Sequence, residues 1–140
     1  MVETSKSVSD ERNNVELDLR PARYDDALAV RSLLDAAVLA VDGVEDRIRA
    51  GDVLVATADD RIVGVVVLDS RADLTRIVGI AVRRRRRASG IGTALVEAAS
   101  QRGTLTAEFN ERVRPFYESL GFKIEPADDP DRCRGVLGRT

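Results

Sequence analysis

Hydrophobic and polar positions repeat with two different periods in the first part of the chain. Val15, Leu17 and Leu19 alternate with charged residues, a pattern that predicts a half-buried strand. After a capping aspartate, Asp25 or Asp26, apolar residues fall at i, i+3, i+4, i+7 and i+8, which is the spacing of one face of a helix. Those apolar positions are Val30, Leu33, Leu34, Ala37 and Val38.

The rest of the chain continues as short strands and helices separated by turn residues. VEDRIRAG, residues 44–51, predicts a short helix, and the aspartates of ADDR, residues 58–61, predict a tight turn between two strands. Apolar residues at helical spacing follow Gly92 and stop at Gly103. Pro115 fits a later helix only in its first turn. Strands are predicted at residues 52–57, 62–68, 74–82, 104–109, 122–125 and 133–137.

Strands that alternate with helices over 140 residues indicate an α/β fold in a single domain. The order of these elements favours a mixed sheet flanked by helices. Residues 1–14 contain no aromatic residue and no apolar period, so we expect a disordered N-terminal tail before a domain at residues 15–140.

Charge and composition narrow the functional classes. The chain has a net charge of −2 and no histidine, which removes the commonest catalytic base and the commonest metal ligand, so we expect no metal site. Its single cysteine, Cys133, allows no disulfide within the chain. The polar N-terminus lacks the apolar segment of a signal peptide, and the longest apolar run, residues 62–68, is too short to cross a bilayer. We expect a cytoplasmic protein that does not bind membranes.

The most unusual stretch is RRRRRASGIG, residues 83–92, in which five arginines lead into two glycines. It lies between a predicted strand and a predicted helix. Glycines at such a turn let the backbone approach a ligand, and the helix N-terminus favours phosphate. Arginines beside the turn add bidentate donors for the same anion. These features favour a pyrophosphate-binding loop.

Three other interpretations of this stretch stay open. In the dinucleotide fingerprint G-x-G-x-x-G, Leu95 would replace the third glycine and Glu108 would be the ribose-binding acid, but the remaining chain is too short for a doubly wound sheet. A nucleic-acid patch would be expected to carry aromatic residues between the arginines on a more basic chain, so we expect no nucleic-acid partner. A solvated turn without a ligand leaves the glycine spacing without a purpose.

Two segments together resemble one known family. Arg87-Ala88-Ser89-Gly90-Ile91-Gly92 matches the R/Q-x-x-G-x-G/A motif of the GNAT superfamily of acyl-CoA-dependent N-acetyltransferases. NERVRPFYESLGF, residues 110–122, resembles the family's later N-x-x-A-x-x-F-Y-E-x-L-G-F pattern, with Val113 in place of alanine. ADDRIVGVVVL, residues 58–68, looks like the hairpin of its second and third strands. The resemblance covers about residues 15–138.

The resemblance implies a sheet that splays between its fourth and fifth strands, here residues 74–82 and 104–109, with acetyl-CoA bound in the opening as cosubstrate. Backbone amides of the arginine–glycine loop would hold the pyrophosphate. The main chain of the fourth strand would pair with the pantetheine arm as an added strand does. An asparagine would contact the pantetheine, and a phenylalanine would pack near the cofactor. The residues carried over are Ile80, Ala81, Val82, Arg87, Ala88, Ser89, Gly90, Ile91, Gly92, Thr93, Asn110 and Phe116.

Acetyl transfer from a thioester to a primary amine needs a neutral amine, donors for the tetrahedral oxyanion, and a proton for the leaving thiolate. By resemblance, the backbone N–H of Ile80 is the oxyanion donor and Tyr117 is the proton donor. Tyr117 also lies on an apolar helical stripe with Val113, Phe116 and Leu120, so a role in the core is the alternative.

No base for the amine is apparent on the fourth strand. Some family members carry a glutamate there, whereas LTRIVGIAV, residues 74–82, has no carboxylate and carries Arg76. Glu108, Asp69 and Asp73 are other candidates, and a water chain is a further route for the proton. The missing base suggests an alternative function, a non-catalytic acyl-CoA-binding regulator of a partner protein.

The acceptor amine is not defined by these motifs. Acidic residues in and after the first predicted helix are candidates to attract a cationic amine: Asp35, Asp42, Glu45 and Asp46. Dimers are common in the family, so a homodimer is one expectation of the resemblance.

Overall fold

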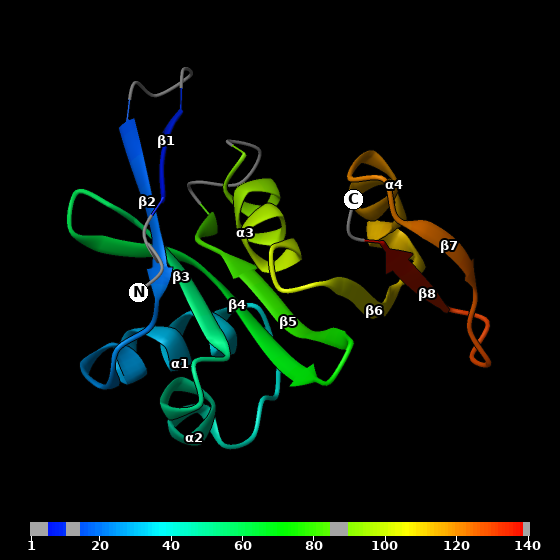
Figure 1. Ribbon diagram of the computed structural model, residues 1–140, viewed down its shortest axis with the longest axis horizontal. Coiled ribbons are helices and arrows are strands. Elements are labelled where there is room, and N and C mark those ends of the chain that lie inside the picture. The colour runs from blue at the N-terminus through cyan, green and yellow to red at the C-terminus, as the bar shows by residue number, and fades with distance from the viewer. Residues whose placement is uncertain (1–5, 11–14, 85–89, 139–140) are drawn as a thin grey trace.

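Eight strands form one mixed sheet in the computed structural model, which describes residues 6–10, 15–84 and 90–138 (Figure 1). The strand order is β1-β2-β3-β4-β5-β6-β8-β7. Every neighbouring pair is antiparallel except β5 and β6, which are parallel. The strands are β1 (Lys6–Asp10), β2 (Val15–Pro21), β3 (Val53–Ala58), β4 (Arg61–Arg71), β5 (Leu74–Val82), β6 (Thr104–Asn110), β7 (Lys123–Pro126) and β8 (Arg132–Leu137).

Helices cover both faces of this sheet. Residues of α1 (Ala27–Ala36) and α2 (Val44–Arg49) form one buried cluster with the sheet, and residues of α3 (Ile91–Ser100) form another. The short α4 (Arg114–Ser119) adds Tyr117 to the α3 cluster. Two 3-10 turns, η1 (Tyr24–Asp26) and η3 (Glu111–Val113), precede α1 and α4. Among the described residues, no helix is long and apolar enough to span a bilayer.

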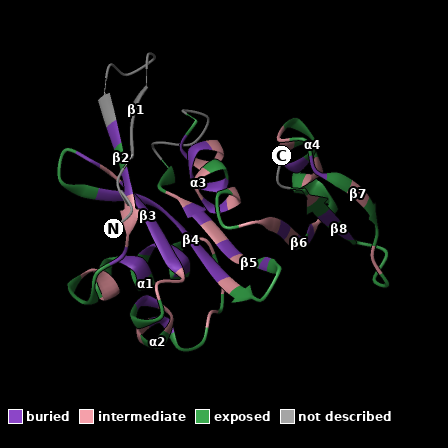
Figure 2. Cartoon of the chain, viewed as in Figure 1, coloured by how far each residue is buried: buried purple, intermediate pink, exposed green. Residues whose placement is uncertain are grey.

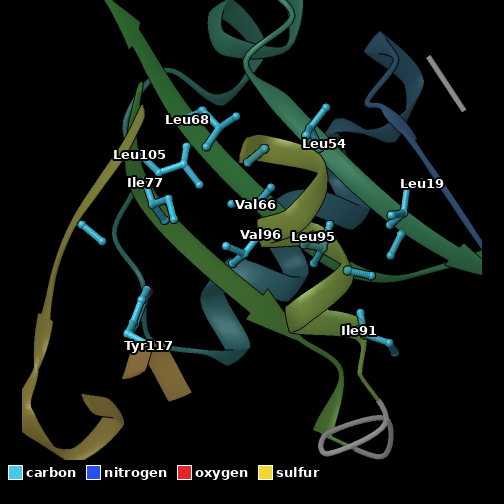
Figure 3. Packing of buried hydrophobic residues seen from close by; sticks show 14 of the residues in the cluster. Leu19, Leu54, Val66, Leu68, Ile77, Ile91, Leu95, Val96, Leu105 and Tyr117 are labelled. Atoms are coloured by element: carbon cyan, nitrogen blue, oxygen red, sulfur yellow. The ribbon is translucent and has the colours of Figure 1, made fainter. Parts of the chain in front are cut away.

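The core is built on β3 and β4, whose positions are almost all buried (Figure 2). Both faces of these strands are covered, which explains why β4 is a continuous apolar run and does not alternate. Ile91, Leu95 and Val96 of α3 point toward Val66 and Leu68 of β4 (Figure 3). The helix approaches β4 closely at Gly64, where a Cβ would lie 2.7 Å from Cγ2 of Ile91 and 3.0 Å from Cδ1 of Leu95.

The sheet splays between β5 and β6. β4 pairs with β5 along its whole length, but β6 pairs with β5 only at Leu74–Ile77, opposite residues 104–107. The β4–β5 register shifts at this point, because Val67 pairs with Gly79 and Leu68 with Ile77, which leaves Val78 as a bulge. A bulge bends its strand and increases the local twist. Beyond it, β6, β8 and β7 turn away from β5 (Figure 1), so the predicted α/β fold and its splay are confirmed.

Two local predictions differ from the structure. Residues 6–10 of the predicted disordered tail form β1, which pairs with β2 through main-chain groups and therefore needs no apolar pattern. The remaining parts of that tail, residues 1–5 and 11–14, lie outside the described residues. Val38 was predicted on the buried face of the first helix. It is 91% exposed with a φ of 57°, because α1 ends at Ala36 and the chain turns.

Candidate functional site

A cavity of about 730 Å³ lies at the splay of the sheet, beside the end of β5. Three segments far apart in the sequence form its walls: the end of β5, the first turn of α3, and the η3–α4 region. The C-cap of α1, Ala37, also reaches it. We call this space the splay cavity. It is lined by Ala37, Ile80, Ala81, Val82, Gly90, Ile91, Gly92, Thr93, Arg112, Val113 and Phe116.

β5 presents free main-chain groups to the splay cavity. The N–H of Arg83 donates to the carbonyl of Val63 at 2.8 Å, so the polar groups of Arg83 face β4. Directions alternate along an extended strand, and Val82 and Ile80 pair with β4 residues at positions where the ladder bonds are absent. The N–H and C=O groups of Ile80 and Val82 therefore face away from β4. Beyond Ile77, β5 has no strand partner on that side among the described residues.

The N-terminus of α3 forms the second wall. Gly90 is its N-cap and has a φ of 85°, a left-handed conformation that glycine adopts without strain. The first helical bond runs from Ala94 N to Gly90 O at 3.0 Å, so the N–H groups of Ile91, Gly92 and Thr93 have no partner within the helix. All three residues line the splay cavity. Unpaired N–H groups and the helix dipole make this end of α3 an anion-binding site.

Space is left open at Gly90 and filled at Gly92. A Cβ on Gly90 would meet no atom within 4 Å, whereas a Cβ on Gly92 would lie 3.3 Å from the Phe116 ring. Gly92 therefore lets α3 and α4 approach each other, and Phe116 closes this side of the cavity. The other predicted loop residues, Arg87, Ala88 and Ser89, lie outside the described residues.

Sequence reasoning missed Arg112, which lines the splay cavity and carries its only positive side chain among the described residues. Asn110 is the N-cap of η3, and its side-chain Oδ1 accepts from the Arg112 N–H at 2.9 Å and from the Arg112 Nε at 3.2 Å. Asn110 itself is not among the lining residues. The family pattern leaves the position of Arg112 unspecified, so no motif could have marked it.

Tyr117 lies in the core at the margin of the α3 cluster, toward α4 (Figure 3). Its ring stacks on Phe109 at 4.0 Å between centroids and meets the edges of Phe116 and Phe122. Burial raises the pKa of the Tyr117 hydroxyl to about 12, against the opposing charge of Arg132. The hydroxyl therefore keeps its proton at neutral pH. Tyr117 is not among the residues that line the splay cavity, whereas its neighbour Phe116 is.

No carboxylate lines the splay cavity among the described residues. Glu108 is exposed on β6, with its carboxylate 4.0 Å from Arg134. Asp69 pairs with Arg71 at 3.2 Å, and Asp73 is exposed in the turn after β4. The described part of the chain also contains no group of three or more His, Cys, Asp or Glu residues that could hold a metal ion. The cavity thus offers main-chain donors, a helix N-terminus and one guanidinium, but no side-chain base.

Comparisons with known proteins agree with this architecture. The model of the acetyltransferase (GNAT) domain matches residues 49–124. The fold is similar to the GNAT domain of PAT from S. lividans, with a TM-score of 0.78 and 16% identity over 96% of each chain.

Two further neighbours were solved with coenzyme A. N-acetylglutamate synthase from Neisseria gonorrhoeae, complexed with coenzyme A and N-acetyl-glutamate, has a TM-score of 0.75 and 16% identity over 89% of this chain and 35% of that one. PaiA N-acetyltransferase from Thermoplasma acidophilum, in complex with coenzyme A, has a TM-score of 0.67 and 16% identity over 87% and 98%.

No curated protein sequence matches the chain. The family model nevertheless spans more than half of the 140 residues and includes both halves of the splay. The chain belongs to the GNAT family of acetyltransferases.

Proposed function

We propose that the protein transfers an acetyl group from acetyl-CoA to a primary amine by direct attack of the amine on the thioester. One observation carries this proposal: a helix N-terminus and the free main-chain edge of a strand face the same cavity at the splay. The first suits a pyrophosphate, and the second suits an extended amide-containing arm. Acyl-CoA carries both groups in one molecule.

The walls of the splay cavity divide the recognition of acetyl-CoA between them. The amides of Ile91, Gly92 and Thr93 would hold the pyrophosphate, together with Arg87, Ala88 and Ser89 of the predicted loop. The main chain of Ile80 to Val82 would pair with the pantetheine arm. Phe116 would pack against it, and Asn110 acts here by positioning Arg112. Arg112 would supply a mobile positive charge to a phosphate from the side opposite α3.

The chemistry then follows from the groups at the free edge of β5. The Ile80 N–H would stabilise the oxyanion of the tetrahedral intermediate, because it faces the splay and has no strand partner. Tyr117 would donate a hydrogen bond to the leaving thiolate, since its high pKa keeps it protonated at neutral pH. With no carboxylate on the cavity wall, the amine would lose its proton to water.

Calorimetric titration with acetyl-CoA, followed by an amine screen with detection of free thiol, tests the proposal. We expect one-to-one binding and amine-dependent thiol release. Binding without turnover of any amine would favour the acyl-CoA-binding regulator, which the missing base also fits. No binding of acetyl-CoA would contradict both functions and return attention to the arginine run as a surface for other polyanions.

A further inference from the structure

We propose that the acceptor amine carries an anionic group on an apolar skeleton, and that it binds in a second cavity between α1 and the end of β5. This inference rests on the proposed function, because it names the substrate class of the same reaction. The second cavity has a volume of about 660 Å³. We call it the α1 cavity.

The α1 cavity adjoins the splay cavity at the place where the acetyl group would be transferred. Ala37 and Val82 line both cavities. Ala37 follows the last turn of α1, and Val82 is the last residue of β5. Because β6 leaves β5 after Ile77, no strand among the described residues separates the two cavities at this end of the sheet. An amine held beside α1 therefore lies next to the free edge of β5.

The charge of the α1 cavity is positive. Arg83 and Arg84 line it, and no acidic residue does among the described residues. The Arg83 Nε donates to the carbonyl of Ile62 at 3.1 Å, which anchors that guanidinium on β4 and leaves its terminal nitrogens for another acceptor. Two neighbouring guanidiniums match a carboxylate or a phosphate through bidentate hydrogen bonds. A cationic polyamine would be repelled here.

The acids that the sequence suggested as attractors for a cationic amine do not line this cavity. Glu45 forms an ion pair with Arg31, and Asp46 lies 3.5 Å from Arg49. Asp35 and Asp42 are exposed, and neither is a wall residue of either cavity. The structure therefore replaces an acidic acceptor site with a basic one.

The remaining walls of the α1 cavity are mostly apolar. Leu28, Leu33, Ala29 and Ala36 come from α1, with Ser32 as the only polar residue that the helix contributes. Leu28 is 78% exposed, so it is available to cover an apolar ligand. The combination of an aliphatic surface and two arginines suits an aliphatic amino acid or an aminoalkyl phosphate.

Matched pairs of amines test this substrate class. L-leucine and 3-methylbutylamine differ only by the carboxylate, and phosphoethanolamine and ethanolamine differ only by the phosphate. We expect kcat/KM to be about ten- to a hundredfold higher for the anionic member of at least one pair, the range of a charged hydrogen bond. The pair with the larger ratio identifies the anion. Equal or higher rates for both simple amines would overturn the proposal.

Two charge-reversal variants separate the cavity from general charge effects. Arg84→Glu should lower the ratio within the preferred pair about tenfold or more, with the affinity for acetyl-CoA unchanged in calorimetry. Arg49→Glu makes the same change in net charge on an exposed arginine that lines neither cavity, and should leave the ratio unchanged. Equal effects of the two variants would refute the assignment.

Failure of the proposed function can be recognised separately. If the protein does not bind acetyl-CoA, titration of the wild-type protein and Arg84→Glu with N-acetyl-leucine and with phosphoethanolamine still tests the α1 cavity. Binding that is lost in Arg84→Glu would support the anion site without the enzyme, whereas no binding, or equal binding to both proteins, would refute it.

Discussion

A single charge placed at Gly90 tests the anion site at the N-terminus of α3. Gly90→Asp and Gly90→Asn add side chains of nearly the same shape into a space where a Cβ meets nothing within 4 Å. Both residues tolerate the left-handed conformation that Gly90 adopts at φ 85° better than other non-glycine residues do. The two variants should therefore have similar stabilities and differ by one negative charge beside the proposed pyrophosphate.

The expected size of the difference follows from Coulomb's law. A carboxylate about 5 Å from one phosphate charge costs about 3 kcal/mol at an effective dielectric constant of about 20. Gly90 is exposed, so solvent and salt reduce this repulsion. We expect the Kd for acetyl-CoA to be about ten- to a hundredfold higher for Gly90→Asp than for Gly90→Asn.

Calorimetric titration of both variants at low and at physiological ionic strength gives the comparison. The difference between the two Kd values should shrink as salt is added, because screening weakens an exposed repulsion. Equal Kd values for Gly90→Asp and Gly90→Asn, with both proteins folded, would show that no anion binds next to Gly90.

Three further residues give separate predictions. Tyr117→Phe should keep the aromatic stack and lower kcat about tenfold or more in a thiol-release assay, and an unchanged kcat would assign Tyr117 to the core alone. Because the folded protein holds the Tyr117 proton up to about pH 12 while the unfolded chain releases it near pH 10, the free energy of unfolding should fall as pH rises through this window, by about 1.4 kcal/mol at pH 11, and urea denaturation of Tyr117→Phe should lack this decline. Gly64→Val should lower the free energy of unfolding by about 2 kcal/mol, since its Cβ would overlap Ile91, and an undiminished melting temperature would contradict the close approach of α3. Arg112→Gln should raise the Kd for acetyl-CoA about tenfold, whereas Arg71→Gln, which lies outside the splay cavity, should not.

The sequence predicted the elements of the fold better than their ends. The residues of β5 were predicted with the observed bounds, and Pro115 lies in the first turn of α4. Local patterns succeed there because glycines, proline and charged residues mark the turns directly. They failed at Val38, where apolar spacing continues past the end of α1 while the chain changes direction. They also missed β1, because an edge strand can be held by main-chain bonds alone.

The candidate site was only partly readable from the sequence. Glycines at the strand-to-helix turn identified the N-terminus of α3, because that chemistry is local to one motif. The position of Arg112 depends on the packing of η3 against the cavity, and the bulge at Val78 depends on the register between β4 and β5. Both are long-range properties, and neither has a residue type that marks it. The ring stack that buries Tyr117 likewise joins α4 to β6 across the fold.

The free edge of β5 has a consequence for how this protein can change over evolutionary time. Peptide N–H and C=O groups are the same in every residue except proline, so a binding surface made from the main chain of Ile80 and Val82 places few demands on side-chain identity. Drift at such positions is limited by packing on α1 and α3 and by the retention of the bulge. Neighbours with 16% identity share this fold, as expected for an architecture whose central strand is conserved in shape and free to vary in composition.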